Sequence, residues 1–152
     1  TVADSLKETL LDPARRPSVV ADLAALIDAE VADKSGVSGL AVKGGYSLLK
    51  KINSSFVPEA IDGMLPDFVA RVAPYYAEYA AAPSGSLSDF LTARSPEVAD
   101  ALLGVTDDRA ESSRRESVKK VYAKLRPQAK KHVEEALPRL GALIENHIKA
   151  AA

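Results

Sequence analysis

The sequence predicts an all-α protein: a single helical domain over residues 1–152, built as an irregular multi-helix bundle of about six to eight helices. Alanine, the best helix former, is abundant, and apolar residues return every third or fourth position along most of the chain. No segment alternates between apolar and polar residues as a strand does. The chain has 152 residues, of which 47% are apolar, and this suits one buried core.

Two helices are predicted in the first 34 residues. Ser5 is followed by Glu8 in the pattern of a capping box, which starts a short first helix. Pro17 is typical of a helix start and Gly36 of a helix stop, so a second helix is expected from about 17 to 34. Its apolar residues follow the helical period: Val19, Val20, Leu23, Leu26, Ile27 and Val31.

A stretch rich in glycine and lysine, SGVSGLAVKGGYSLLKKI, predicts a third helix over residues 37–52. Gly44 lies on its apolar side, where glycine costs about 1 kcal/mol relative to alanine. We therefore expect another helix to pack closely against Gly44. The order Lys43–Gly44 reverses the Gly-Lys order of a phosphate-binding loop and no strand precedes it, so close packing is favoured. The apolar side comprises Val37, Leu40, Ala41, Gly44, Leu48 and Ile52.

Prolines divide the next segment. Pro58, Pro66 and Pro74 recur at intervals of eight, and each can start a helix or kink one. The pattern predicts a short helix over residues 58–64 and a longer one over 66–81 that bends near Pro74.

Capping signals then predict two further helices. Ser86 and Asp89 form a second capping box, which starts a short helix ending near residue 93. Ser95 is a helix start, Gly104 a stop, and Thr106 can cap one more turn.

The longest helical pattern begins at about residue 113. Pro127 and Pro138 interrupt it, so we expect either two helices or one kinked helix. The residues predicted to be buried in the core of the whole protein are Leu23, Ile27, Leu40, Leu48, Phe68, Val72, Leu102, Val121, Leu137, Leu140 and Ile144.

Charge is unevenly distributed, although the net charge is only −1. Residues 61–112 carry nine acidic and three basic side chains, whereas residues 113–131 carry eight basic and one acidic. This basic amphipathic helix could contact nucleic acid, an anionic membrane surface or an acidic partner. The favoured alternative is neutralisation by the acidic segment of the same chain. The basic residues are Arg114, Arg115, Lys119, Lys120, Lys124, Arg126, Lys130 and Lys131.

Other chemical signals are weak. Tyr75, Tyr76 and Tyr79 share one helical patch, which could stack on a small ligand but fits the edge of a core better. His132 and His147 lack the Glu-x-x-His spacing of a di-metal bundle, and the sequence has no cysteine. We predict no catalytic residue, no metal and no cofactor.

These observations predict a non-enzymatic protein that binds another macromolecule, either an unknown protein partner or a second copy of itself. The alternatives are polyanion binding by residues 114–131 and a small-ligand pocket at the tyrosines. The N-terminus has early acids and no basic region, so we expect no signal peptide. No apolar run is long enough to cross a membrane, and the expected location is cytoplasmic.

Three stretches carry a resemblance. LKETLLDPARRP, VVADLAALIDAEVADKSGVSGLAVKGGY and ALPRLGALIENH resemble a family of small, alanine-rich, uncharacterised proteins of high-GC, actinobacterial-type bacteria. The resemblance implies a helical, soluble, bacterial protein. It implies no activity, cofactor or site residue.

Overall fold

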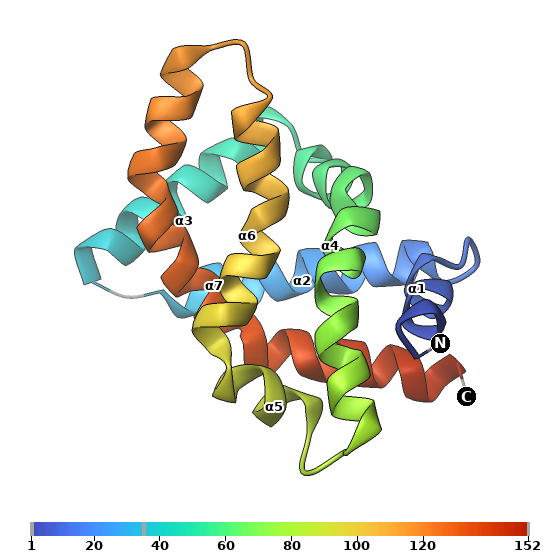
Figure 1. The fold of residues 1–152 in the computed structure, drawn as a ribbon. Coiled ribbons are helices and arrows are strands. Elements are labelled where there is room, and N and C mark those ends of the chain that lie inside the picture. Colours follow the sequence, from blue (N-terminus) through green and yellow to red (C-terminus); the bar gives the residue numbers. More distant parts are fainter. Residues whose placement is uncertain (1, 35, 152) are drawn as a thin grey trace.

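The computed structural model describes residues 2–34 and 36–151, and within them it has seven helices and no strand (Figure 1). The predicted all-α fold and the predicted number of helices are confirmed. The helices are α1 (Val2–Leu11), α2 (Arg16–Asp33), α3 (Gly36–Ile52), α4 (Phe56–Ala81), α5 (Leu87–Ala93), α6 (Ser95–Glu111) and α7 (Glu116–Ala151). No described helix combines the length and the hydropathy needed to span a membrane.

The predicted helix starts are confirmed at several positions. Pro17 lies in the first turn of α2, and α6 begins at Ser95. The Ser86 hydroxyl accepts the N–H of Asp89 at 3.0 Å, as the capping box requires. Gly36 has a φ of +76°, which favours glycine, and it lies where α3 begins after α2.

Prolines bend helices here without ending them. The predicted separation into helices over 58–64 and 66–81 is wrong, because α4 runs through Pro66 and Pro74 as one 26-residue helix. Likewise α7 runs through Pro127 and Pro138 for 36 residues, and Figure 1 shows it turning between its orange and red halves. An interior proline costs about 3 kcal/mol. In α4, burial offsets this cost: buried residues lie on both sides of Pro66, and Pro74 follows buried Val72 and Ala73 and precedes the half-buried Tyr75 and Tyr76.

Gly104 does not end α6, which continues to Glu111. Its neighbours Leu103 and Val105 are both buried, so packing on either side of the glycine keeps the helix intact. The first helix also differs from prediction, because α1 begins at Val2 and Ser5 lies inside it.

The core is formed by every helix except α3. Its buried residues come from α1, α2, α4, α5, α6 and the second half of α7: Leu6, Leu10, Val19, Leu65, Val69, Val72, Ala73, Leu87, Leu91, Val98, Leu102, Leu137 and Ile144. In the described chain, α3 packs only on α2 and α4. The core therefore does not depend on the apolar residues of α3.

Four of the predicted core residues are buried as expected: Val72, Leu102, Leu137 and Ile144. Four more are half-buried: Leu23, Ile27, Phe68 and Leu140. The prediction is wrong for Leu40, Leu48 and Val121, which are exposed. These three lie on the sides of α3 and α7 that face away from the bundle.

Candidate functional site

The apolar side of α3 has no partner in the described chain. Leu40, Leu48 and Ile52 are 71%, 59% and 73% exposed, and we call these three residues the α3 apolar face. A Cβ built on Gly44, between Leu40 and Leu48, meets nothing within 4 Å. The predicted close helix packing at Gly44 is therefore wrong within this chain.

The opposite side of α3 is attached to α2. The Tyr46 hydroxyl donates to Asp28 Oδ1 at 2.6 Å, and Lys50 Nζ donates to the same oxygen at 3.1 Å. The Tyr46 hydrogen bond, with help from Lys50, lowers the pKa of Asp28. Burial and the bond to Asp28 together raise the pKa of Tyr46 to about 12. These bonds fix the rotation of α3, so that its apolar face points outward.

The first half of α7 also exposes an apolar side to solvent while its opposite side is bonded to a neighbouring helix. Val118, Val121 and Leu125 share one side of the helix and are 42%, 55% and 56% exposed; we call them the α7 apolar face. Beside them Lys120, Lys124 and Lys131 follow a helical spacing and form a lysine row. All three lysines are exposed, and none forms an ion pair with an acidic residue of the described chain.

Other basic residues of this segment are neutralised by the same chain. Arg126 donates through Nε and Nη2 to the two carboxylate oxygens of Asp107, at 2.7 and 2.9 Å. Lys130 donates to Asp100 at 2.9 Å, and Lys119 pairs with Glu116 at 3.7 Å. Acidic residues of the same chain thus neutralise the basic residues on one side of α7.

Arg114 and Arg115, which also belong to the predicted basic site, are exposed and precede the first residue of α7. The lysine row and these two arginines are the part of the predicted basic site that faces solvent. The side that carries Arg126 and Lys130 packs against α6.

We expect acid to weaken the contact between α6 and α7. Arg126 lowers the pKa of Asp107, and Lys130 lowers that of Asp100. Because both pKa values are depressed by folding, the stabilisation is present at neutral pH and is lost as pH falls below about 4. We expect Asp107→Asn to cost about 1 kcal/mol at neutral pH and to flatten this acid dependence.

Urea unfolding at several pH values measures this effect. Glu111→Gln, an exposed acid at the end of α6, is the matched control and should leave the acid dependence unchanged. An Asp107→Asn variant with the wild-type pH dependence would contradict the assignment.

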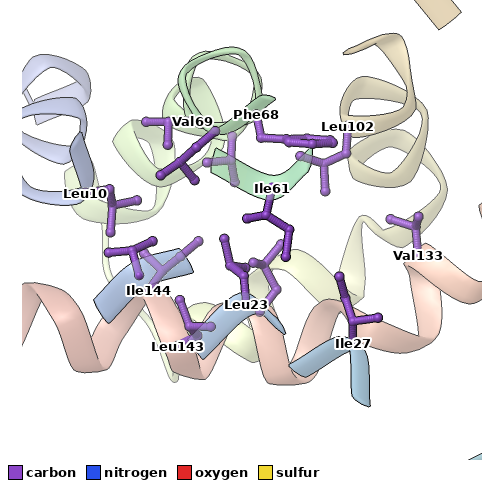
Figure 2. Close-up of a pocket in the computed structure, with 14 residues that line it drawn as sticks. Leu10, Leu23, Ile27, Ile61, Phe68, Val69, Leu102, Val133, Leu143 and Ile144 are labelled. Carbon is purple, nitrogen blue, oxygen red and sulfur yellow. The ribbon is translucent and has the colours of Figure 1, made fainter. Parts of the chain in front are cut away.

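A second feature is a cavity of about 200 Å³ inside the core (Figure 2). Its walls come from α1, α2, α4, α6 and α7, and every lining residue is apolar. The lining residues are Leu10, Val19, Leu23, Ile27, Ile61, Leu65, Phe68, Val69, Val72, Leu102, Val133, Leu140, Leu143 and Ile144.

Apolar side chains that line such a space lack packing partners on one side, so they forfeit van der Waals contacts when the space is empty. The cavity is not evident from the sequence. The only signal was the four-residue spacing of Val19, Leu23 and Ile27, which indicates a buried row and says nothing of how well that row is filled.

The tyrosine patch does not line this cavity. Tyr75 lies under the guanidinium of Arg94, whose Cζ is 5.1 Å from the ring centroid. The Tyr79 hydroxyl donates to the carbonyl of Gly85 at 2.7 Å. All three tyrosines, including Tyr76, are half-buried against the core. Burial raises the pKa of Tyr75 and Tyr79, as expected for rings at a core edge.

The two histidines lie in different surroundings. His147 is buried, with Nε2 at 2.7 Å from Asp22 Oδ2. His132 Nδ1 is buried without a hydrogen-bond partner in the described chain, as is Glu30 Oε1. A bound water would satisfy such atoms. No group of three or more metal-ligating side chains gathers among the described residues.

The fold first defines the class of protein: an all-α bundle with an apolar cavity in its core and with exposed apolar faces on α3 and on the first half of α7. Sequence comparison then gives the family. The chain belongs to a family of unknown function, DUF6918, whose model matches residues 6–148. The predicted membership of an uncharacterised family is thereby confirmed, while the bacterial origin stays a prediction. No curated protein and no solved structure matches the chain.

Proposed function

We propose that this protein acts by binding an anionic lipid surface through α3 and the first half of α7. One observation carries the proposal: both helices expose a row of Leu, Ile or Val, and both carry exposed lysine. On α3 the exposed lysine is Lys51, whereas Lys50 is paired with Asp28 on the opposite side, and the helix contains no acidic residue. Figure 1 shows both segments on the side of the molecule away from the two chain termini.

The exposed apolar side chains and the lysines are both features of helices that lie at a membrane interface. Apolar side chains gain about 25 cal/mol per Å² when they leave water, and each lysine near an anionic leaflet contributes about 1 kcal/mol. Amphipathic helices with lysine on the polar side use these two terms together to lie in the lipid headgroup region. The α7 apolar face and the lysine row supply both terms on one helix.

Nucleic acid fits this surface less well. The phosphates of a nucleic acid would contact the lysine row, but the α3 and α7 apolar faces would stay exposed to water. Aromatic rings, on which bases stack, are absent from these two faces. The exposed Leu, Ile and Val side chains therefore favour lipid over nucleic acid as the polyanion.

The test is cosedimentation with vesicles of phosphatidylcholine alone and with vesicles that also contain phosphatidylglycerol. We expect binding only to the second kind, and we expect it to weaken as salt shortens the Debye length from about 10 Å at 0.1 M. Replacing Lys120 and Lys124 together by Glu should weaken binding about tenfold or more. Replacing Leu40 and Leu48 together by Ser should do the same.

Matched controls lie on other surfaces. Lys149→Glu reverses an exposed lysine at the end of α7, and Val2→Ser replaces an exposed apolar residue of α1. Both should bind vesicles like the wild type. Binding to duplex DNA that the serine variant retains would overturn the proposal in favour of nucleic acid. A lipid-free dimer that the serine variant abolishes would overturn it in favour of self-association.

A further inference from the structure

The apolar cavity is a second site, separate from the surface proposed above. We infer that it binds a linear hydrocarbon chain of about eight carbon atoms. All fourteen lining residues are apolar, so the walls offer no side-chain hydrogen-bond donor or acceptor. A ligand that fills the cavity must therefore place only hydrocarbon inside it, because a polar group buried there would lose its hydrogen bonds to water.

The lining residues form rows along the helices. On α2 they are Val19, Leu23 and Ile27, which span about 12 Å at 1.5 Å per residue. On α7 they run from Val133 to Ile144, about 16 Å. Figure 2 shows the same elongation, with Leu10 and Ile144 toward one end and Ile27 and Val133 toward the other. A space of this shape fits an extended chain better than a compact ring.

The volume sets the length of the chain. An apolar cavity of about 150 Å³ stays dry and binds benzene, which has six carbons. Scaling to the roughly 200 Å³ found here gives about eight carbons.

A chain can reach the cavity from solvent. Six of the lining residues are only half-buried: Leu23, Ile27, Phe68, Val133, Leu140 and Leu143. The wall is therefore partly open to water, and a polar head group can stay outside while the chain occupies the apolar space. The ligand class is consequently a medium-length alkyl chain, either as a neutral alcohol or as a carboxylate.

Thermal unfolding and calorimetric titration with straight-chain alcohols test the inference. A ligand that binds the folded state raises its stability in proportion to the logarithm of ligand concentration, so 1-octanol should raise the melting temperature. Affinity should increase about fourfold per added methylene up to about eight carbons, and then level off. Octanoate should bind within about tenfold of octanol, because its head group stays in solvent.

Two variants locate the binding. Val133→Phe fills the cavity and should abolish the octanol effect, whereas Leu48→Phe adds the same ring type on the exposed α3 apolar face and should retain it. Leu143→Phe, at another half-buried lining position, replaces Val133→Phe if circular dichroism shows that the latter does not fold. No stabilisation by octanol, or stabilisation that both cavity-filled variants keep, would overturn the inference. Failure of vesicle binding would not, because the two sites share no residue.

Discussion

Gly141→Ala is expected to lower the free energy of unfolding by about 1–3 kcal/mol, whereas Gly44→Ala raises it by up to about 1 kcal/mol. Both glycines lie inside helices, so alanine gives each helix the same gain in propensity. The surroundings differ. A Cβ on Gly141 would lie 2.6 Å from the backbone N and Cα of Ser88, while a Cβ on Gly44 meets nothing within 4 Å.

The contact at Gly141 cannot relax cheaply, because the opposing atoms belong to the backbone of α5. The Ser88 hydroxyl also donates to the carbonyl of Pro138 at 2.6 Å, and the Leu87 N–H donates to Glu145. A shift of α5 away from a new methyl group would stretch both bonds. Overpacking of this kind exceeds the propensity gain of about 0.5–1 kcal/mol.

Urea denaturation of the wild type and the two variants measures the difference directly. The pair is internally controlled, because the substitution is the same and only the neighbouring atoms change. A loss at Gly44 as large as the loss at Gly141 would mean that α3 packs against another helix in solution, and no loss at Gly141 would mean that α5 and α7 are not in close contact there.

These two glycines show which features of helix packing the sequence predicts and which it does not. The 3.6-residue period correctly predicts that Gly44 lies on the apolar side of a helix, but the close helix approach predicted at Gly44 from the cost of glycine is wrong. The period cannot say which helix side meets a neighbour, because that depends on residues distant in the sequence. Close approach occurs at Gly141, which the same reasoning did not select.

Helix existence was predictable and helix ends were less so. Every described helix overlaps a predicted one, because local periodicity and capping residues such as Ser86 act over a few positions. The stops predicted at Pro66 and Gly104 are wrong, because burial of the flanking residues outweighs the local penalty. Tertiary packing decides those positions, and a single sequence carries little of that information.

The candidate sites were predictable only in part. The basic character of residues 113–131 is evident from composition, but the division into a neutralised side and the solvent-facing lysine row depends on where α6 places Asp100 and Asp107. The cavity could not be predicted, because it results from imperfect filling between five helices. A stripe of leucine and valine looks the same whether or not its neighbours leave a gap.

Leu137→Ala should lower the free energy of unfolding by about 2–5 kcal/mol. Leu137 is 0% exposed and belongs to the same buried cluster as Leu87, Leu91 and Val98. Removing its branched end loses burial and leaves a new void that rigid neighbours fill only partly. For a chain of this length the melting temperature should fall by roughly 4–20 °C.

Leu48→Ala is the matched control, since it makes the same substitution at a 59% exposed position of the α3 apolar face. Its effect on stability should stay within about 0.5 kcal/mol, while its binding to anionic vesicles should weaken. Stability and binding would thus separate between two leucines of identical chemistry. If Leu48→Ala costs as much as Leu137→Ala in lipid-free solution, the α3 apolar face is already buried there, and a protein contact rather than a lipid surface covers it.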